Sequence, residues 1–375
     1  LHLVPGIGPR RFRRLLERFG SPERILGASE SDLLDVVGVT PQLAQSIRLT
    51  SNRKHQELLD RELHEIEEKG VRLYFWGDPD YPQSLAQISD PPCVLYVRGQ
   101  ILPRDEFSIA IVGSRRISNY GRTMSRTFAS ELARSGLTII SGFARGADSQ
   151  AHWGALESGG RTIAVFGNGL NVCYPRENKE LLERIVESGA LVSELPMNTG
   201  PLRENFPLRN RLISALSLGT LVVEAPKKSG ALITARYVAE HGKHLFALPG
   251  RVGESGSVGP HSLIREGAVL VQSPQDIMRE LESLLNRMQE EKGEKTITPV
   301  PESVDRPVDA AIPSDLSESE RRVLSCISDE AMPMDEVTRK AGISAHEAAG
   351  CLLALEMRGL VARLPGMRYI LSRRC

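Results

Sequence analysis

Short apolar runs alternate with helical patterns through the central part of the chain. The runs predict buried strands, and the apolar residues between them recur at helical spacing. Apolar strands separated by helices are typical of a parallel sheet covered on both faces, so we expect a Rossmann-like α/β core with a mostly parallel sheet. The strands are expected at 108–112, 137–140, 162–166, 190–192, 220–223, 244–248 and 268–271, and the helices at 120–135, 147–158, 179–188, 209–218 and 231–241.

The first 70 residues predict a small all-α domain of three to five helices. Two glycine turns, Gly6-Ile7-Gly8 and Gly38-Val39, each precede apolar residues at helical spacing, which suggests a SAM-like or helix-hairpin-helix-like domain. A charged helix is expected from Arg53 to Lys69. Its apolar face would consist of Leu58, Leu59, Leu63 and Ile66.

The C-terminal residues 316–375 predict a helix, a short helix, a longer helix and a hairpin, which is the order of a winged helix. A helix ending near Gln289 closes the α/β domain, which we place at 71–289. Residues 290–315 then predict an acidic, proline-containing linker, because residues 276–320 carry 12 acidic and 5 basic residues. The expected domains are therefore 1–70, 71–289 and 316–375.

Composition excludes a disordered tail, a collagen and a wholly basic nucleic-acid coat protein. The 375 residues include 47 Lys and Arg and 47 Asp and Glu, and 41% are apolar, as in ordinary globular domains. No apolar run is long enough to span a membrane and the first residues do not have the pattern of a secretory leader, so we expect a cytoplasmic protein. Because Leu1 lies within an apolar pattern, we also expect a few residues to precede it. The five cysteines lie far apart, which argues against disulfides and against a metal site.

Cationic and glycine-rich turns follow several of the expected strands. Residues 105–275 hold 19 Lys and Arg against 15 Asp and Glu. Glycine lets a backbone approach a ligand closely, and guanidinium groups bind phosphate, so these turns favour anion binding at the carboxyl edge of the sheet. Aromatic residues among them could stack on bases. The turns are Gly113-Ser114-Arg115-Arg116, Gly142-Phe143-Ala144-Arg145-Gly146, Gly167-Asn168-Gly169, Tyr174-Pro175-Arg176-Glu177-Asn178, Asn205-Phe206-Pro207-Leu208-Arg209-Asn210-Arg211 and Lys227-Lys228.

The N-terminal turn Gly6-Ile7-Gly8 is a second candidate contact with DNA. Arg10, Arg11, Arg13 and Arg14 follow it, and backbone amides, helix dipole and cations together bind phosphate without reading sequence. A purely structural role for the same glycines, permitting a tight turn between helices, remains open.

Enzyme motifs are weak. Gly167-x-Gly169 lacks the third glycine of a dinucleotide-binding loop, and no P-loop is present. Ser141, Asp148 and His152 suggest a hydrolytic triad only superficially, because Asp148 and His152 are four residues apart on one expected helix and Ser141 lies outside a nucleophile elbow. We expect His152 to be a hydrogen-bonded residue on a packed helix face and Asp148 to stabilise the helix start.

Together the loops resemble the DNA-processing protein A family (DprA, also called Smf). The resemblance extends over about 140 residues of the central domain, and the flanking domains resemble those of longer members. It rests on Ile111-Val112-Gly113-Ser114-Arg115, Ser141-Gly142-Phe143-Ala144-Arg145-Gly146-Ala147-Asp148, Tyr174-Pro175, Ser193-Glu194, Asn205-Phe206-Pro207, Arg209-Asn210-Arg211, Val223-Glu224-Ala225, Ser229-Gly230-Ala231-Leu232-Ile233-Thr234-Ala235 and Leu248-Pro249-Gly250.

The resemblance implies a non-catalytic protein without cofactor or metal. Such a protein binds single-stranded DNA in a basic pocket, forms a homodimer, protects incoming DNA in natural transformation, loads the RecA recombinase and eases displacement of single-strand-binding protein. The family's pocket cations would fall on Arg115 and Arg176. The full set of expected DNA-contacting residues is Gly113, Ser114, Arg115, Arg116, Gly142, Arg145, Gly146, Arg176, Asn178, Phe206, Arg209, Asn210, Arg211, Lys227 and Lys228.

Two other functions remain as alternatives. One is a nucleotide-processing enzyme of the phosphoribohydrolase type on the same scaffold, although its P-G-G-x-G-T loop is absent. The other is a sequence-specific regulator acting through the winged helix. The start of the third helix of that domain, Ser344 to Gly350, carries no Arg or Lys, so we favour a protein-contact or accessory role for it. Arg363 and Arg368 are its remaining DNA candidates.

Overall fold

The computed structural model describes residues 1–292, 316–327, 332–358, 360–364 and 368–371. The chain divides into two compact units, Leu1–Glu302 and Ser303–Cys375, so the helical domain and the α/β domain belong to one unit. The expected linker at 290–315 lies almost wholly outside the described residues. Within the described part of the chain, every helix is too short or too polar to cross a membrane.

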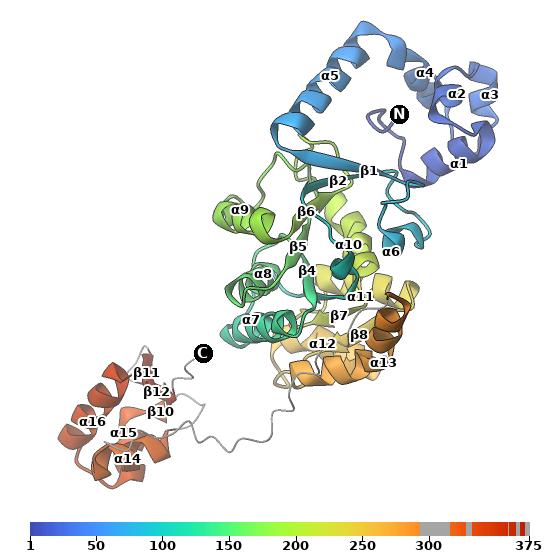
Figure 1. Cartoon of the computed structure of the whole chain (residues 1–375). Coiled ribbons are helices and arrows are strands. Elements are labelled where there is room, and N and C mark those ends of the chain that lie inside the picture. The colour runs from blue at the N-terminus through green and yellow to red at the C-terminus, as the bar shows by residue number, and fades with distance from the viewer. Residues whose placement is uncertain (293–315, 328–331, 359, 365–367, 372–375) are drawn as a thin grey trace. The chain divides into compact units, whose positions relative to one another are not determined.

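A nine-stranded sheet forms the centre of the first unit (Figure 1). Its spatial order is β1-β2-β6-β5-β4-β3-β7-β8-β9, and all neighbours from β6 to β9 are parallel, whereas β2 pairs antiparallel with β6 and with β1. The mostly parallel α/β fold is therefore confirmed. The strands are β1 (Val71–Phe75), β2 (Val94–Gly99), β3 (Ser108–Val112), β4 (Thr138–Gly142), β5 (Thr162–Val165), β6 (Ala190–Ser193), β7 (Gly219–Val222), β8 (His244–Ala247) and β9 (Val269–Leu270).

Helices cover both faces of this sheet. Successive side chains of a strand point to opposite faces, so Ile109 and Ile111 pack with Phe128 on one face, while Ala110 and Val112 pack with Leu212 on the other. The first face carries α7 (Asn119–Arg134), α8 (Ala147–Glu157), α9 (Lys179–Ser188) and α13 (Pro274–Lys292), and the second carries α6 (Gln83–Ala86), α10 (Asn205–Leu216), α11 (Gly230–Glu240) and α12 (Val258–Arg265).

Three features of this unit differ from the expected pattern. The β1–β2 hairpin extends the sheet with two antiparallel strands, and α13 continues to Lys292 instead of ending near Gln289. Helix α10 begins at Asn205, not Arg209, so Phe206 and Arg209 lie on a helix. Pro207 belongs to its first turn, where a backbone N–H would have no helical partner in any case.

The N-terminal domain contains α1 (Pro9–Phe19), α2 (Pro22–Leu26), α3 (Glu30–Leu34), α4 (Pro41–Arg48) and α5 (Arg53–Glu68). Gly6 and Gly38 have φ of 91° and 92°, as tight turns before α1 and α4 require. The apolar face expected on α5 is largely open to solvent: Leu58, Leu59 and Leu63 are exposed and Ile66 is half-buried. Glu62 is buried instead, and its Oε1 accepts a 2.8 Å hydrogen bond from the Met197 amide.

The second unit is a winged helix, as expected. Its helices surround a small core that includes Val323, Leu352 and Tyr369. The strands form a three-stranded antiparallel sheet in the order β10-β12-β11. The elements are α14 (Glu318–Cys326), β10 (Met332–Pro333), α15 (Met334–Ala341), α16 (Ala345–Met357), β11 (Val361–Leu364) and β12 (Arg368–Leu371).

Candidate nucleic-acid interface

A pocket of about 140 Å³ opens at the carboxyl edge of the parallel strands. This edge is where open α/β sheets place ligands, because the loops leaving adjacent strands meet there. The loops after β3, β4 and β5 and the start of α10 supply its walls. The lining residues are Arg115, Arg116, Phe143, Ala144, Arg145, Phe166, Gly167, Asn168, Tyr174, Pro175, Phe206 and Arg209.

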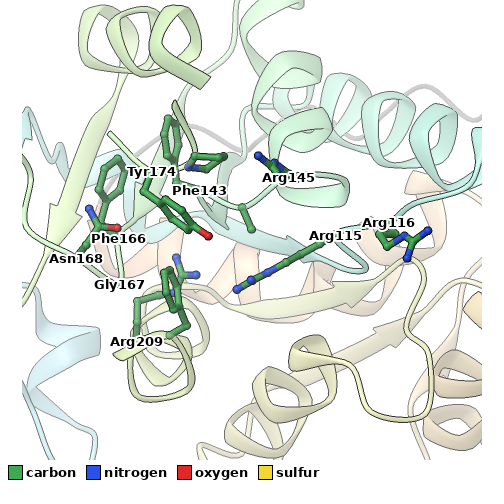
Figure 2. Close-up of a pocket in the computed structure, with 12 residues that line it drawn as sticks. Arg115, Arg116, Phe143, Arg145, Phe166, Gly167, Asn168, Tyr174 and Arg209 are labelled. Carbon is green, nitrogen blue, oxygen red and sulfur yellow. The ribbon is translucent and has the colours of Figure 1, made fainter. Parts of the chain in front are cut away.

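The aromatic ring of Phe206 lies between cationic and aromatic neighbours. The Cζ atoms of Arg115 and Arg209 lie 5.3 and 5.9 Å from its ring centroid, within the range of cation–π attraction. The ring of Tyr174 lies 5.9 Å away and is tilted by 46°. Figure 2 shows Arg115 extended toward Tyr174 and Arg209. Side chains from three distant segments thus combine positive charge with flat surfaces.

Buried charges form the floor of the pocket. Arg209 is only 5% exposed; its Nη1 donates to the Val165 carbonyl, and its Nε has no hydrogen-bond partner in the described part of the chain. Burial raises the pKa of the Asp148 carboxyl to about 6, although the nearby Arg209 favours its ionised form. Burial likewise lowers the pKa of Arg209 to about 10. The floor therefore holds a cation and a carboxyl group that titrates close to neutral pH.

Glycines allow this floor and the loop above it to form. A Cβ atom on Gly142 would lie 2.5 Å from Asp148 Oδ2 and 2.7 Å from Arg209 Nη1, so both groups reach the end of β4 only because it has no side chain. Gly146 has φ of 80°, and a Cβ there would lie 2.2 Å from the Ser114 carbonyl oxygen. The start of α8 therefore packs directly against the loop that carries Arg115.

The geometry excludes the Ser141–Asp148–His152 triad. Ser141 Oγ donates to the Ile111 carbonyl at 2.6 Å, while the two ring nitrogens of His152 face Thr162 Oγ1 and the Gly142 carbonyl at 2.6 and 3.1 Å. Burial lowers the pKa of His152 to about 4, so its ring is neutral at pH 7. His152 is the hydrogen-bonded, packed residue that we expected. Asp148 Oδ2 accepts a 3.3 Å bond from the Ala144 amide, ahead of the helix.

The pocket brings together some of the expected DNA-contacting residues and separates the others. Arg115, Arg116, Arg145, Phe206 and Arg209 line it, although Arg145 is paired with Glu177. Other expected residues do not line it. The backbone around the pocket is shaped by Gly113, Ser114, Gly142 and Gly146. Arg176 is exposed outside the pocket, and Lys227 and Lys228 are exposed in the loop after β7. Asn178 and Asn210 donate hydrogen bonds to the Phe143 and Gly230 carbonyls.

Arg211 lies away from the pocket. It is 3% exposed, its Nη2 donates to Glu194, and its Nε lies 3.5 Å from Asp90. Burial raises the pKa of Glu194, and the charge of Arg211 opposes that shift. The guanidinium of Arg211 therefore neutralises internal carboxylates, and we do not retain it as a DNA contact.

The arginines after the first glycine turn also have partners within the protein. Arg11 Nη1 donates to the Gly6 carbonyl at 2.7 Å, and Arg14 Nη1 to the Val37 carbonyl at 3.0 Å. Arg13 pairs with Glu17, and Arg10 lies 4.0 Å from Asp90 of the α/β domain. These contacts favour the structural interpretation of this turn. In the winged helix, α16 exposes Glu347, Ala349 and Gly350 near its start, while the side chains of Arg363 and Arg368 lie outside the described residues.

The pocket also contains residues that are absent from the set of expected DNA-contacting residues. Phe143, Asn168 and Tyr174 lie in the expected anion-binding turns, and Phe166 was expected within a strand. Phe143 and Phe166 stack with ring centroids 4.6 Å apart. Their position directly after β4 and β5 was the signal available in the sequence. An aromatic residue at a strand end, however, is equally compatible with burial in the core.

Three family models and several known proteins are similar to this chain. The model of the DNA recombination-mediator protein A family matches residues 72–282, the DprA winged-helix model matches 307–367, and a SAM-like helix-hairpin-helix tandem model matches 1–52. Protein Smf of Escherichia coli is 42% identical over 296 residues, which cover 79% of this chain and 76% of that protein.

Two solved structures are similar to this chain. DNA processing protein A from Streptococcus pneumoniae is 34% identical with a TM-score of 0.66, over 74% of this chain and 95% of that one. DNA processing protein A from Helicobacter pylori, whose structure is described as revealing a single-stranded DNA binding mode, is 32% identical with a TM-score of 0.52, over 57% and 96%. The expected family is thus confirmed, and the chain belongs to the DNA recombination-mediator protein A family.

Proposed function

We propose that this protein binds single-stranded DNA in the pocket at the carboxyl edge of its sheet, without sequence preference. The observation that carries the proposal is the convergence of Arg115 and Arg209 on the Phe206 ring, beside Tyr174. Guanidinium groups bind phosphates, and aromatic rings stack on any base. The H. pylori relative, whose described subject is single-stranded DNA binding, supports the same ligand.

The biological role that we propose is that of a recombination mediator. The protein would protect incoming single-stranded DNA in natural transformation and load RecA onto it, acting as a homodimer in the cytoplasm and easing displacement of single-strand-binding protein. Family membership supports this role. We place the DNA contacts on Arg115, Arg116, Phe206 and Arg209, with Arg176 at the margin.

We propose a binding function rather than catalysis. The groups that resemble a catalytic set, Ser141, Asp148 and His152, each bond to backbone or to neighbouring side chains below the pocket. Within the described residues, no cluster of His, Cys, Asp and Glu could hold a metal ion. The phosphoribohydrolase alternative gains no specific support from this geometry.

Replacing Arg115 by Ala tests the proposal. The variant should bind oligo-dT about tenfold more weakly, and its salt slope should be smaller by about 0.7 because one phosphate contact is lost. The measurement is a salt titration of oligo-dT and of duplex DNA of equal length. Arg134→Ala is a matched control, since Arg134 is exposed in the last turn of α7, at the opposite edge of the sheet. Equal affinity and equal slopes for the two variants would refute the assignment.

A further inference from the structure

Exposed cations continue along the carboxyl edge beyond the pocket. Lys227 and Lys228 follow β7, and Arg251 follows β8. Because the sheet order runs β5-β4-β3-β7-β8, these loops are the next ones along the edge after the loop of Arg115 and Arg116. Figure 2 shows Arg116 on the side of Arg115 that is away from Tyr174. Arg116 therefore lies where the pocket gives way to this outer edge.

The charge of the three adjoining loops is strongly biased. Residues 113–118, 224–230 and 249–257 expose one carboxylate, Glu254, while their other acidic residue, Glu224, is buried. The same loops carry five exposed cations. They are Arg115, Arg116, Lys227, Lys228 and Arg251. A surface with this balance attracts a polyanion.

Hydrogen bonds of buried Glu224 and of the Ala225 amide hold the three loops together. Its Oε2 accepts a 2.9 Å hydrogen bond from the Ser118 amide and its Oε1 one from the Ser118 hydroxyl, which fixes the loop after β3 to the loop after β7. The Ala225 amide donates to the Gly256 carbonyl at 2.7 Å, which joins the loop after β8. The cations of the three loops are thus carried on one connected surface.

Exposed apolar side chains belong to these loops or directly follow them. Tyr120 is 46% exposed at the start of α7, and its hydroxyl donates to the Pro249 carbonyl at 2.9 Å, which fixes the ring beside the loop after β8. Val252 in that loop is 94% exposed. A fixed, half-exposed aromatic ring at the edge of a cationic surface is a suitable platform for a stacked base.

We infer that a single strand held in the pocket continues across the loops after β7 and β8, where Lys227 and Lys228 bind its phosphates and Tyr120 stacks on a base. This inference rests on the proposed function of the pocket. Four steps separate β5 from β8, and adjacent strands lie about 4.8 Å apart, so the path is roughly 19 Å long. At the stacked rise of about 3.4 Å per nucleotide, it holds about six nucleotides.

The test compares two lengths of oligo-dT on the full chain. The double variant Lys227→Ala/Lys228→Ala should bind a 15-mer about tenfold more weakly, with a salt slope smaller by about 1.4, because two phosphate contacts are lost. Its affinity for a 4-mer, measured at low salt by fluorescence anisotropy, should stay within twofold of wild type because a short strand occupies the pocket alone. The control Arg134→Ala/Arg265→Ala removes the same charge from the C-terminal ends of α7 and α12.

Each outcome decides between two claims. Equal 15-mer affinities for the lysine variant and the control would overturn the outer path while leaving the pocket intact. If the lysine variant bound the 4-mer and the 15-mer more weakly by the same factor, the outer path would also be overturned. The lysines would then belong to the pocket or act only through the long-range electrostatic field of the surface. If Arg115→Ala weakened the binding of neither oligonucleotide, the proposed DNA binding in the pocket would itself be refuted.

Discussion

At the residue scale, the charge of the pocket depends on one proton. Ionised Asp148 offsets part of the positive charge of Arg209, and burial raises its pKa to about 6. Protonation therefore increases the net positive charge beneath the bound phosphates. Because a bound polyanion favours the protonated carboxyl, DNA binding and proton uptake by Asp148 are linked.

We therefore predict that oligo-dT binds more tightly as the pH falls from 7.5 to 5, by about tenfold, at fixed ionic strength. Neither phosphodiesters nor thymine titrate in this range, and the lowered pKa of His152, about 4, keeps it neutral over most of it. Asp148→Asn should abolish most of this pH dependence. Fluorescence anisotropy at a series of pH values measures both proteins, and an unchanged profile in the variant would place the titrating group elsewhere.

At the element scale, the site depends on close contact between the start of α8 and the loop after β3. Gly146 allows this contact, because its φ of 80° is unfavourable for other residues and a Cβ atom there would lie 2.2 Å from the Ser114 carbonyl oxygen. Gly136, in the turn between α7 and β4, has φ of 92°, but a Cβ there would have no atom within 4 Å among its non-neighbouring residues. Comparing substitutions at the two glycines therefore separates the cost of backbone strain from the cost of steric conflict.

Gly146→Ala should destabilise the fold by about 3 kcal/mol or more, since it adds overpacking to the strain of a positive φ. Gly136→Ala should cost about 1 kcal/mol. Urea denaturation of both variants gives the two values. If the two costs were equal, the packing between α8 and the loop after β3 would not be as tight as described.

Most elements of the α/β domain could be predicted because buried parallel strands are continuous apolar runs. The antiparallel pair β1–β2 could not, since in β1 the buried Val71 and Tyr74 lie three positions apart, not at the two-residue spacing of a half-buried strand. The predicted start of α10 is wrong because Pro207 resembles a helix breaker. The apolar face of α5 has helical periodicity, but periodicity does not say which side packs, and Glu62 faces the α/β domain instead.

At the scale of the whole molecule, the site combines residues nearly a hundred positions apart in the sequence. The expected sheet placed the loops of Arg115 and Arg145 at one edge, so that part of the site could be predicted. The sequence could not show that Arg211 pairs with Glu194 and Asp90 while Arg209, two residues earlier, reaches the pocket. Successive residues of a helix point in different directions, and only the tertiary contacts select which one faces the ligand.

The most direct test of the central claim is photo-crosslinking of the full chain to oligo-dT that carries a single photoreactive thymine analogue, followed by mass spectrometry of the peptides. The pocket predicts adducts on Phe206 and Tyr174, which disappear when excess unlabelled oligo-dT competes. Adducts confined to the winged helix or to the N-terminal domain, with none on Phe206, Tyr174 or Phe143, would contradict it.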